Sequence, residues 1–87
     1  MAKYSIRFKK SVTKDLRSIP ANDVTRILNR FDEIAENPRG PGCQKLSDQS
    51  RYRVRLGSYR ILYEINDVTV VVLIVKVAHR SRVYQSS

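Results

Sequence analysis

The chain has 87 residues and a mass of 10.1 kDa. Its seventeen lysines and arginines outnumber eight aspartates and glutamates, which gives a formal net charge of +9 at pH 7. This length predicts a single domain over residues 1–87 and excludes multidomain enzymes and TIM barrels. So large an excess of positive charge indicates an anionic partner such as nucleic acid, an acidic protein or a membrane surface.

Cysteine and histidine are scarce, which limits the chemistry open to the chain. Cys43 and His79 are the single residues of their types, so an intrachain disulfide and a Cys/His zinc site are both excluded, and we expect no metal or other cofactor. The longest apolar run, Val70–Val75, is far shorter than the roughly 20 residues of a membrane span. No signal-peptide pattern opens the sequence. We therefore expect a cytoplasmic protein without a membrane partner.

The first half of the chain predicts a strand and two helices. Apolar residues at every second position predict a half-buried strand over residues 4–8. A short helix follows and ends before Pro20, and a longer helix ends at Asn37-Pro38. A turn of about three residues joins the two helices, so they should form an antiparallel hairpin. The apolar stripe of the longer helix consists of Val24, Ile27, Leu28, Phe31, Ile34 and Ala35.

The second half predicts strands. Residues 38–44 contain two prolines and two glycines and should form a loop. Residues 51–65 alternate around Gly57-Ser58, which is typical of a hairpin with a type II′ turn. Asn66-Asp67 predicts a second tight turn, and residues 68–77 an interior strand. The order is β-α-α-β-β-β. We expect an α+β fold in which a two-helix hairpin covers one face of a four-stranded antiparallel sheet.

The hairpin register gathers arginines on one face. With Gly57-Ser58 as the turn, Arg55 lies directly opposite Arg60, and Arg53 shares their face. Like charges in opposed positions destabilise a sheet, so this arrangement indicates an anion between them. An arginine-rich strand is also typical of a plain solvated face, and a register slip of one residue would separate the group. The opposite face should meet the helices with Tyr52, Val54, Leu56, Ile61 and Tyr63.

The last strand extends the same prediction. With Asn66-Asp67 as the turn, Arg60 should pair with Leu73, and a regular strand then places His79 on the face of Arg60. A lone histidine is more often structural than catalytic, but its near-neutral titration suits proton transfer. Three further residues should lie just beyond that end of the sheet, namely Arg80, Arg82 and Tyr84.

Two stretches of sequence resemble a known family. YRVRLGSYRILYEI at residues 52–65 and VVVLIVKVAHRSRVY at residues 70–84 resemble the RelE/ParE superfamily of bacterial toxins, and the RelE branch more than the gyrase-directed ParE branch. The resemblance implies a type II toxin encoded beside an acidic, RelB-like antitoxin. It also implies a metal-independent endoribonuclease, or mRNA interferase, that cleaves message in the ribosomal A site. In that reaction the 2′-hydroxyl of the RNA attacks the neighbouring phosphate and the message is cut. Cutting the message inhibits translation.

The resemblance also implies roles for individual residues. Arg60 and Arg80 match arginines that stabilise the charged transition state, and Tyr84 matches a C-terminal tyrosine that accepts a proton or stacks on a base. The RNA-binding residues would be Arg53, Arg55 and Arg82. The best-known family pattern has lysines where this chain has Arg53 and Arg55, and arginine does not exchange protons near neutral pH. His79 is the obvious replacement for a proton-transfer group.

Two other functions explain the same sequence. A ParE-like toxin would poison DNA gyrase without nuclease chemistry and would need no convergence of His79, Arg80 and Tyr84 on the arginine face. A non-enzymatic basic module that binds nucleic acid would account for the net charge of +9 equally well.

Overall fold

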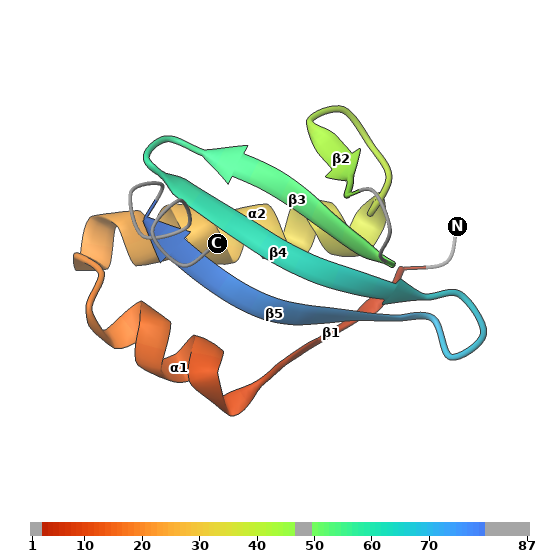
Figure 1. Cartoon of the computed structure of the whole chain (residues 1–87), viewed down its shortest axis with the longest axis horizontal. Coiled ribbons are helices and arrows are strands. Elements are labelled where there is room, and N and C mark those ends of the chain that lie inside the picture. The colour runs from red at the N-terminus through yellow and green to blue at the C-terminus, as the bar shows by residue number, and fades with distance from the viewer. Residues whose placement is uncertain (1–2, 47–49, 80–87) are drawn as a thin grey trace.

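The computed structural model describes residues 3–46 and 50–79 and consists of a curved sheet with two helices (Figure 1). The five strands lie in the order β1-β5-β4-β3-β2. The α+β class and the two helices predicted from the sequence are confirmed. The elements in chain order are β1 (Ser5–Phe8), α1 (Lys10–Arg17), α2 (Ala21–Glu36), β2 (Cys43–Lys45), β3 (Arg51–Leu56), β4 (Tyr59–Asn66) and β5 (Val71–His79).

The prediction of a four-stranded antiparallel sheet is wrong in two details. β1 pairs with β5 in parallel, from Ser5 opposite Val71 to Phe8 opposite Ile74. The expected loop over residues 38–44 ends in the short strand β2, which pairs with β3 in antiparallel fashion. The antiparallel prediction came from tight turns, and no tight turn joins β1 to its neighbour. A strand of three residues is too short for alternation to reveal it.

The hydrophobic core lies between α2 and one face of the sheet, as the helical stripe predicted. α2 runs behind the strands, while α1 lies along β5 (Figure 1). Leu28 is an exception, because it belongs to the predicted stripe but is 43% exposed. The side-chain hydroxyl of the fully buried Tyr63 donates a hydrogen bond of 2.6 Å to the Pro38 carbonyl, which satisfies its polar atom. The other buried members of this core are Val12, Ile27, Phe31, Ile34, Val54, Ile61, Val72, Ile74 and Val77.

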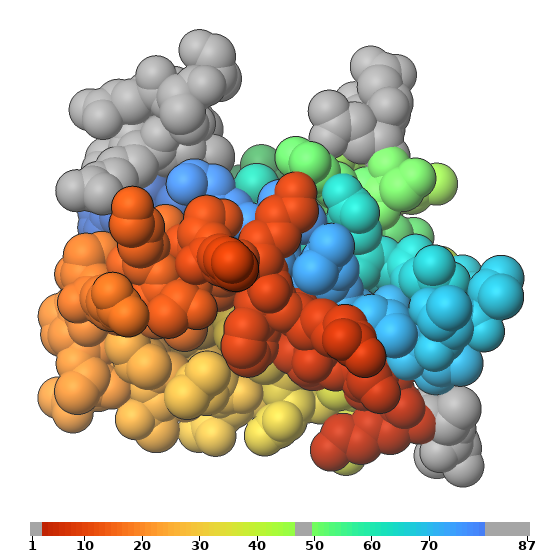
Figure 2. Space-filling model, turned by 90° about the horizontal axis from the view of Figure 1, so that it is seen from below, coloured from red at the N-terminus to blue at the C-terminus, as the bar shows by residue number. Residues whose placement is uncertain are grey.

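The edge of β5 is covered partly by β1 and partly by α1. Beyond the last β1 pair, the Val77 N–H donates a hydrogen bond of 3.2 Å to an Asp15 carboxylate oxygen. Lys76 Nζ lies 3.9 Å from the other oxygen of that carboxylate. Figure 2 shows β1 and α1 side by side in front of β5. An exposed strand edge invites pairing with other chains, and α1 closes this edge through a side chain instead of a strand.

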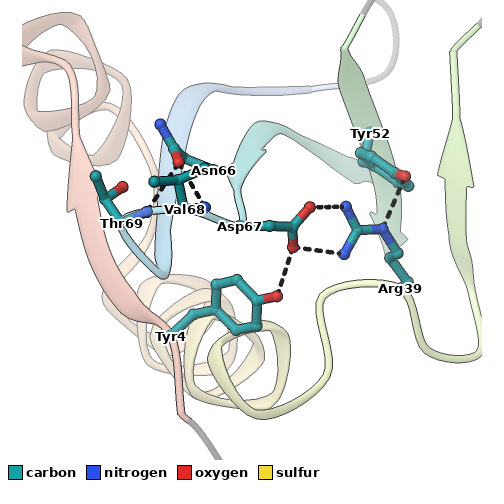
Figure 3. Close-up of polar contacts among 7 residues, drawn as sticks. All are labelled: Tyr4, Arg39, Tyr52, Asn66, Asp67, Val68 and Thr69. Carbon is teal, nitrogen blue, oxygen red and sulfur yellow. Dashed lines mark hydrogen bonds and ion pairs between the residues drawn. The ribbon is translucent and has the colours of Figure 1, made fainter.

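The turn between β4 and β5 is longer than predicted. Asn66 pairs with Val71, so the turn has four residues between the strands in place of the predicted tight turn at Asn66-Asp67. The side-chain carbonyl of Asn66 accepts hydrogen bonds of 3.0 Å from the N–H groups of Val68 and Thr69 (Figure 3), an arrangement typical of asparagine in turns. The predicted pairing of Arg60 with Leu73 is wrong, because Arg60 lies opposite Ala78.

A β-bulge in β5 changes which face its last residues occupy. Leu62 pairs with Lys76 and Tyr63 with Ile74, so Val75 is an extra residue without a partner on β4. The four-residue turn keeps the predicted alternation of side chains, but one extra residue reverses it for everything that follows. His79 therefore pairs with Tyr59 and not with a residue of the Arg60 face.

A polar cluster joins four segments at the end of the sheet where β4 turns into β5 (Figure 3). The Arg39 guanidinium donates two hydrogen bonds to the Asp67 carboxylate, of 3.0 and 2.8 Å, and a third of 3.1 Å to the Tyr52 hydroxyl. The Tyr4 hydroxyl donates a bond of 2.7 Å to Asp67. The hydrogen bonds from Arg39 and then Tyr4 lower the pKa of Asp67 from 3.8 to about 2.

This cluster predicts a contribution to folding stability that is present near neutral pH, is lost in acid, and is removed by Asp67→Asn. Because the pKa of Asp67 is lower in the folded than in the unfolded protein, its contribution is complete above about pH 4 and is lost as pH falls through about 2. We expect Asp67→Asn to be less stable than the natural sequence at pH 6, and the two proteins to converge between pH 4 and 2. Urea unfolding at pH 6, 4, 3 and 2 measures this difference. A difference that stays constant over that range would contradict it.

Candidate functional site

The hairpin of β3 and β4 has the register that the sequence predicts. Gly57 has a φ of +58°, as the first central residue of a type II′ turn requires. Arg55 lies directly opposite Arg60, and Leu56 opposite Tyr59. The side of the sheet that faces away from α2, hereafter the open face, therefore carries Arg53, Arg55 and Arg60 together. The prediction that these three arginines share one face is confirmed.

The three arginines differ in exposure. Arg60 is 5% exposed and is the one charged residue among the described residues that is classed as buried, whereas Arg55 is exposed and Arg53 is half-buried. Neither Arg53 nor Arg55 forms an ion pair with a carboxylate of residues 3–46 or 50–79. With Arg55 opposite Arg60, the open face thus brings three guanidinium groups together, and guanidinium groups bind phosphate through paired hydrogen bonds.

A shallow hollow of about 280 Å³ lies beside Arg53 and Arg55. It is lined by Gly42, Gln44, Arg53 and Arg55. Arg53 Nη2 donates a hydrogen bond of 3.1 Å to the Gln44 side-chain carbonyl. Gln44 lies on β2 directly opposite Arg53. Sequence reasoning missed Gln44 because it assigned this segment to a loop, and three residues give no periodic signal.

His79 does not lie where the sequence predicts. Its ring packs edge-on against Tyr59, with 5.6 Å between ring centroids, and it shares the face of Tyr59, opposite that of Arg60. The predicted convergence of His79 and Arg60 on one face is wrong, because the bulge at Val75 reverses the alternation. The Tyr59 hydroxyl donates a bond of 3.3 Å to Asp23 on α2. Burial, with a smaller contribution from Asp23, raises the pKa of Tyr59, so this phenol stays protonated near neutral pH.

The remaining predicted site residues, Arg80, Arg82 and Tyr84, lie outside the described residues. Within the described part of the chain, no group of three His, Cys, Asp or Glu side chains could hold a metal ion. Neither α1 nor α2 is long and apolar enough to cross a membrane.

Comparison with known proteins identifies the family. The family described as the ParE toxin of the type II toxin–antitoxin system, parDE, matches residues 6–84. The chain belongs to this family. The RelG toxin of Mycobacterium tuberculosis is 27% identical over 84 residues, which cover 94% of this chain and 97% of RelG. The toxin is therefore similar to RelE-type proteins along nearly its whole length, and the resemblance found in its sequence is confirmed.

Solved structures agree with this assignment. The toxin–antitoxin complex RelBE2 of M. tuberculosis contains a chain that matches with a TM-score of 0.83 and 27% identity, covering 93% of this toxin and 95% of that chain. The archaeal RelE–RelB complex of Pyrococcus horikoshii contains one with a TM-score of 0.77 and 31% identity, covering 94% and 99%. The protein is a RelE-like toxin of a type II toxin–antitoxin module.

Proposed function

We propose that this toxin is a ribosome-dependent, metal-independent endoribonuclease that cleaves messenger RNA in the ribosomal A site. The observation that carries the proposal is the opposition of Arg55 and Arg60 on the open face, with Arg53 beside them. Arginine binds phosphate through two parallel hydrogen bonds and keeps its charge at any physiological pH. Three such groups on one rigid hairpin suit an RNA backbone better than a neutral ligand.

The proposed reaction divides its work among these cations and the C-terminal residues. The 2′-oxygen forms a bond to the adjacent phosphorus as the phosphorus–5′-oxygen bond breaks. This leaves a 2′,3′-cyclic phosphate on one fragment and a 5′-hydroxyl on the other. The 2′-hydroxyl proton passes to a base, for which we propose Tyr84 as its phenolate, and the leaving 5′-oxygen takes a proton from solvent water. Arg60 and Arg80 stabilise the extra negative charge of the phosphorane-like transition state, while Arg53, Arg55 and Arg82 hold the RNA.

The ribosome is the proposed context because a chain of 87 residues has little surface with which to position one phosphate of a long RNA. We expect fast cleavage of message in a programmed ribosome with an empty A site, and slow or no cleavage of the same RNA free in solution. Single-turnover assays on both substrates, with primer extension to map the cut, measure the two rates. Equal rates on free and ribosome-bound RNA would reject the ribosome requirement.

We further propose an acidic, RelB-like antitoxin as the natural partner. The M. tuberculosis and P. horikoshii neighbours are toxin–antitoxin complexes, and the net charge of +9 complements an acidic chain. We expect a partner of roughly 70–90 residues, with an acidic C-terminal part that buries the open face, to co-purify with the toxin from its native operon. A salt series during purification tests the electrostatic contribution. Elution of the toxin alone at low salt would contradict the proposal.

A gyrase-directed toxin is the second candidate, because the matching family is described by the name ParE. Such a toxin would inhibit DNA supercoiling by gyrase and leave ribosome-bound message intact. A supercoiling assay run beside the cleavage assay separates the two functions. A pure nucleic-acid-binding module would do neither, and its binding would weaken gradually as single arginines are removed.

A further inference from the structure

A side-chain hydrogen bond joins Arg53 on β3 to Gln44 on β2 and gives this arginine an uncharged partner. The ion-paired arginines Arg26, Arg30, Arg39 and Arg51 each face a carboxylate, as in Arg51 with Glu64 at 3.2 Å. Arg53 instead donates to the amide carbonyl of Gln44, at 3.1 Å. A carboxylate would orient the guanidinium but also neutralise it. An amide oxygen orients it and leaves the full positive charge for a ligand.

Gln44 is held in place from the other side of the sheet. The loop before it is fixed by Arg30 of α2, whose Nη2 donates a bond of 3.2 Å to the Pro41 carbonyl and whose Nη1 lies 2.6 Å from Glu33. Gly42 has a φ of +85°, and a Cβ there would lie 3.3 Å from Arg30 Nη2. β2 then pairs with β3 through three residues. The strand that carries Gln44 is therefore held at two places, by the contact of Arg30 with the preceding loop and by the pairing of β2 with β3.

The hollow beside Gln44 and Arg53 is a place where a phosphate could meet the oriented guanidinium. Its lining includes Arg53 and Arg55 from β3 and Gln44 from β2, and Gly42 contributes no side chain that would fill it. An arginine on a solvated strand samples many rotamers, and each must be given up when a phosphate binds. An acceptor that holds the guanidinium over the hollow in advance reduces that cost.

From these contacts, and resting on the proposed function, we infer that Gln44 is a positioning residue that orients the Arg53 guanidinium toward the RNA backbone without neutralising it. Its effect passes through Arg53, so it should change binding of the RNA more than the chemical step. The substitution Gln44→Met tests this, because methionine keeps the length of the side chain and removes the acceptor. Asn29→Ala on the exposed side of α2 is the matched loss of an amide.

Single-turnover cleavage on programmed ribosomes should separate binding from rate. We expect Gln44→Met to raise the concentration for half-maximal cleavage about fivefold, with the maximal rate within twofold and Asn29→Ala unchanged. In an Arg53→Ala background, Gln44→Met should add no further loss, because the group it positions is gone. Equal effects of Gln44→Met in both backgrounds, or no effect while Arg53→Ala alone weakens binding, would overturn the inference and leave the proposed function intact. If substitution of Arg53 and substitution of Arg60 both leave binding and cleavage unchanged, the proposed site is rejected instead.

Nuclear magnetic resonance of the free toxin gives a readout that needs no activity. The guanidinium N–H signals of Arg53 should exchange with water more slowly than those of Arg55 in the natural sequence. Gln44→Met should bring the two to similar rates, and Asn29→Ala should not. Arg53 signals that exchange as fast as those of Arg55 before the substitution would overturn the inference.

Discussion

Arg60→Met is expected to lower the single-turnover rate of message cleavage by about 10²–10³, the scale of losing one preorganised group at a developing charge. Methionine keeps an unbranched side chain in a position that is 5% exposed, so no large cavity is created. The guanidinium acts in a desolvated position, where its attraction for a phosphorane is stronger than in water. Ribosome affinity should fall much less, because many other cations remain. Rates at saturating toxin, with affinity measured on a message that carries 2′-deoxyribose at the cleavage position, provide the two numbers.

Two further variants control this experiment. Arg60→Lys keeps the charge but loses the planar fork, so we expect it to fall between the natural sequence and Arg60→Met. Arg17→Ala removes one exposed positive charge from α1 and should change the rate less than about threefold. Circular dichroism confirms that each variant is folded before it is assayed. If Arg60→Met cleaves within threefold of the natural sequence, Arg60 does not stabilise the transition state, and the gyrase-directed or binding function becomes the better account.

Local patterns predicted the part of the site that lies on one hairpin. Arg53, Arg55 and Arg60 are joined by a tight turn whose glycine fixes the register, so their common face follows from alternation alone. The helical stripe likewise identified the buried side of α2, with Leu28 as its exception. These features depend on residues that are near one another in the sequence, and a pattern of period two or 3.6 carries that information.

The position of His79 could not be predicted in this way. Residues 70–75 are apolar without interruption, so the strand carries no alternation that would show where an extra residue enters. The bulge at Val75 is visible only from the pairing with β4, and it moves His79 to the other face. The same limit applies to β1, whose parallel partner lies more than sixty residues away, and to Gln44, whose value depends on its pairing with Arg53.

Tyr84→Phe is expected to lower the single-turnover rate by about 10²–10⁴ if the phenol takes the 2′-hydroxyl proton, because the substitution removes only that oxygen. A tyrosine that merely stacks on a base would lose almost nothing, since the ring is kept. An ordinary phenol titrates near pH 10, so proton transfer near neutral pH requires that arginines at the site stabilise the phenolate. Rates from about pH 5.5 to 9 should rise with pH in the natural sequence and lose that limb in Tyr84→Phe.

His79→Gln separates the tyrosine from the histidine as the source of this limb. His79 packs against Tyr59 on the face away from Arg60, so we expect His79→Gln to keep the shape of the pH–rate profile and to change the rate much less than Tyr84→Phe. If His79→Gln loses a limb of the pH–rate profile while Tyr84→Phe stays active, the imidazole and not the phenol transfers the proton. If both variants cleave within about threefold of the natural sequence at every pH, neither group transfers the proton. The arginine face would then serve binding, without the nuclease chemistry proposed for it.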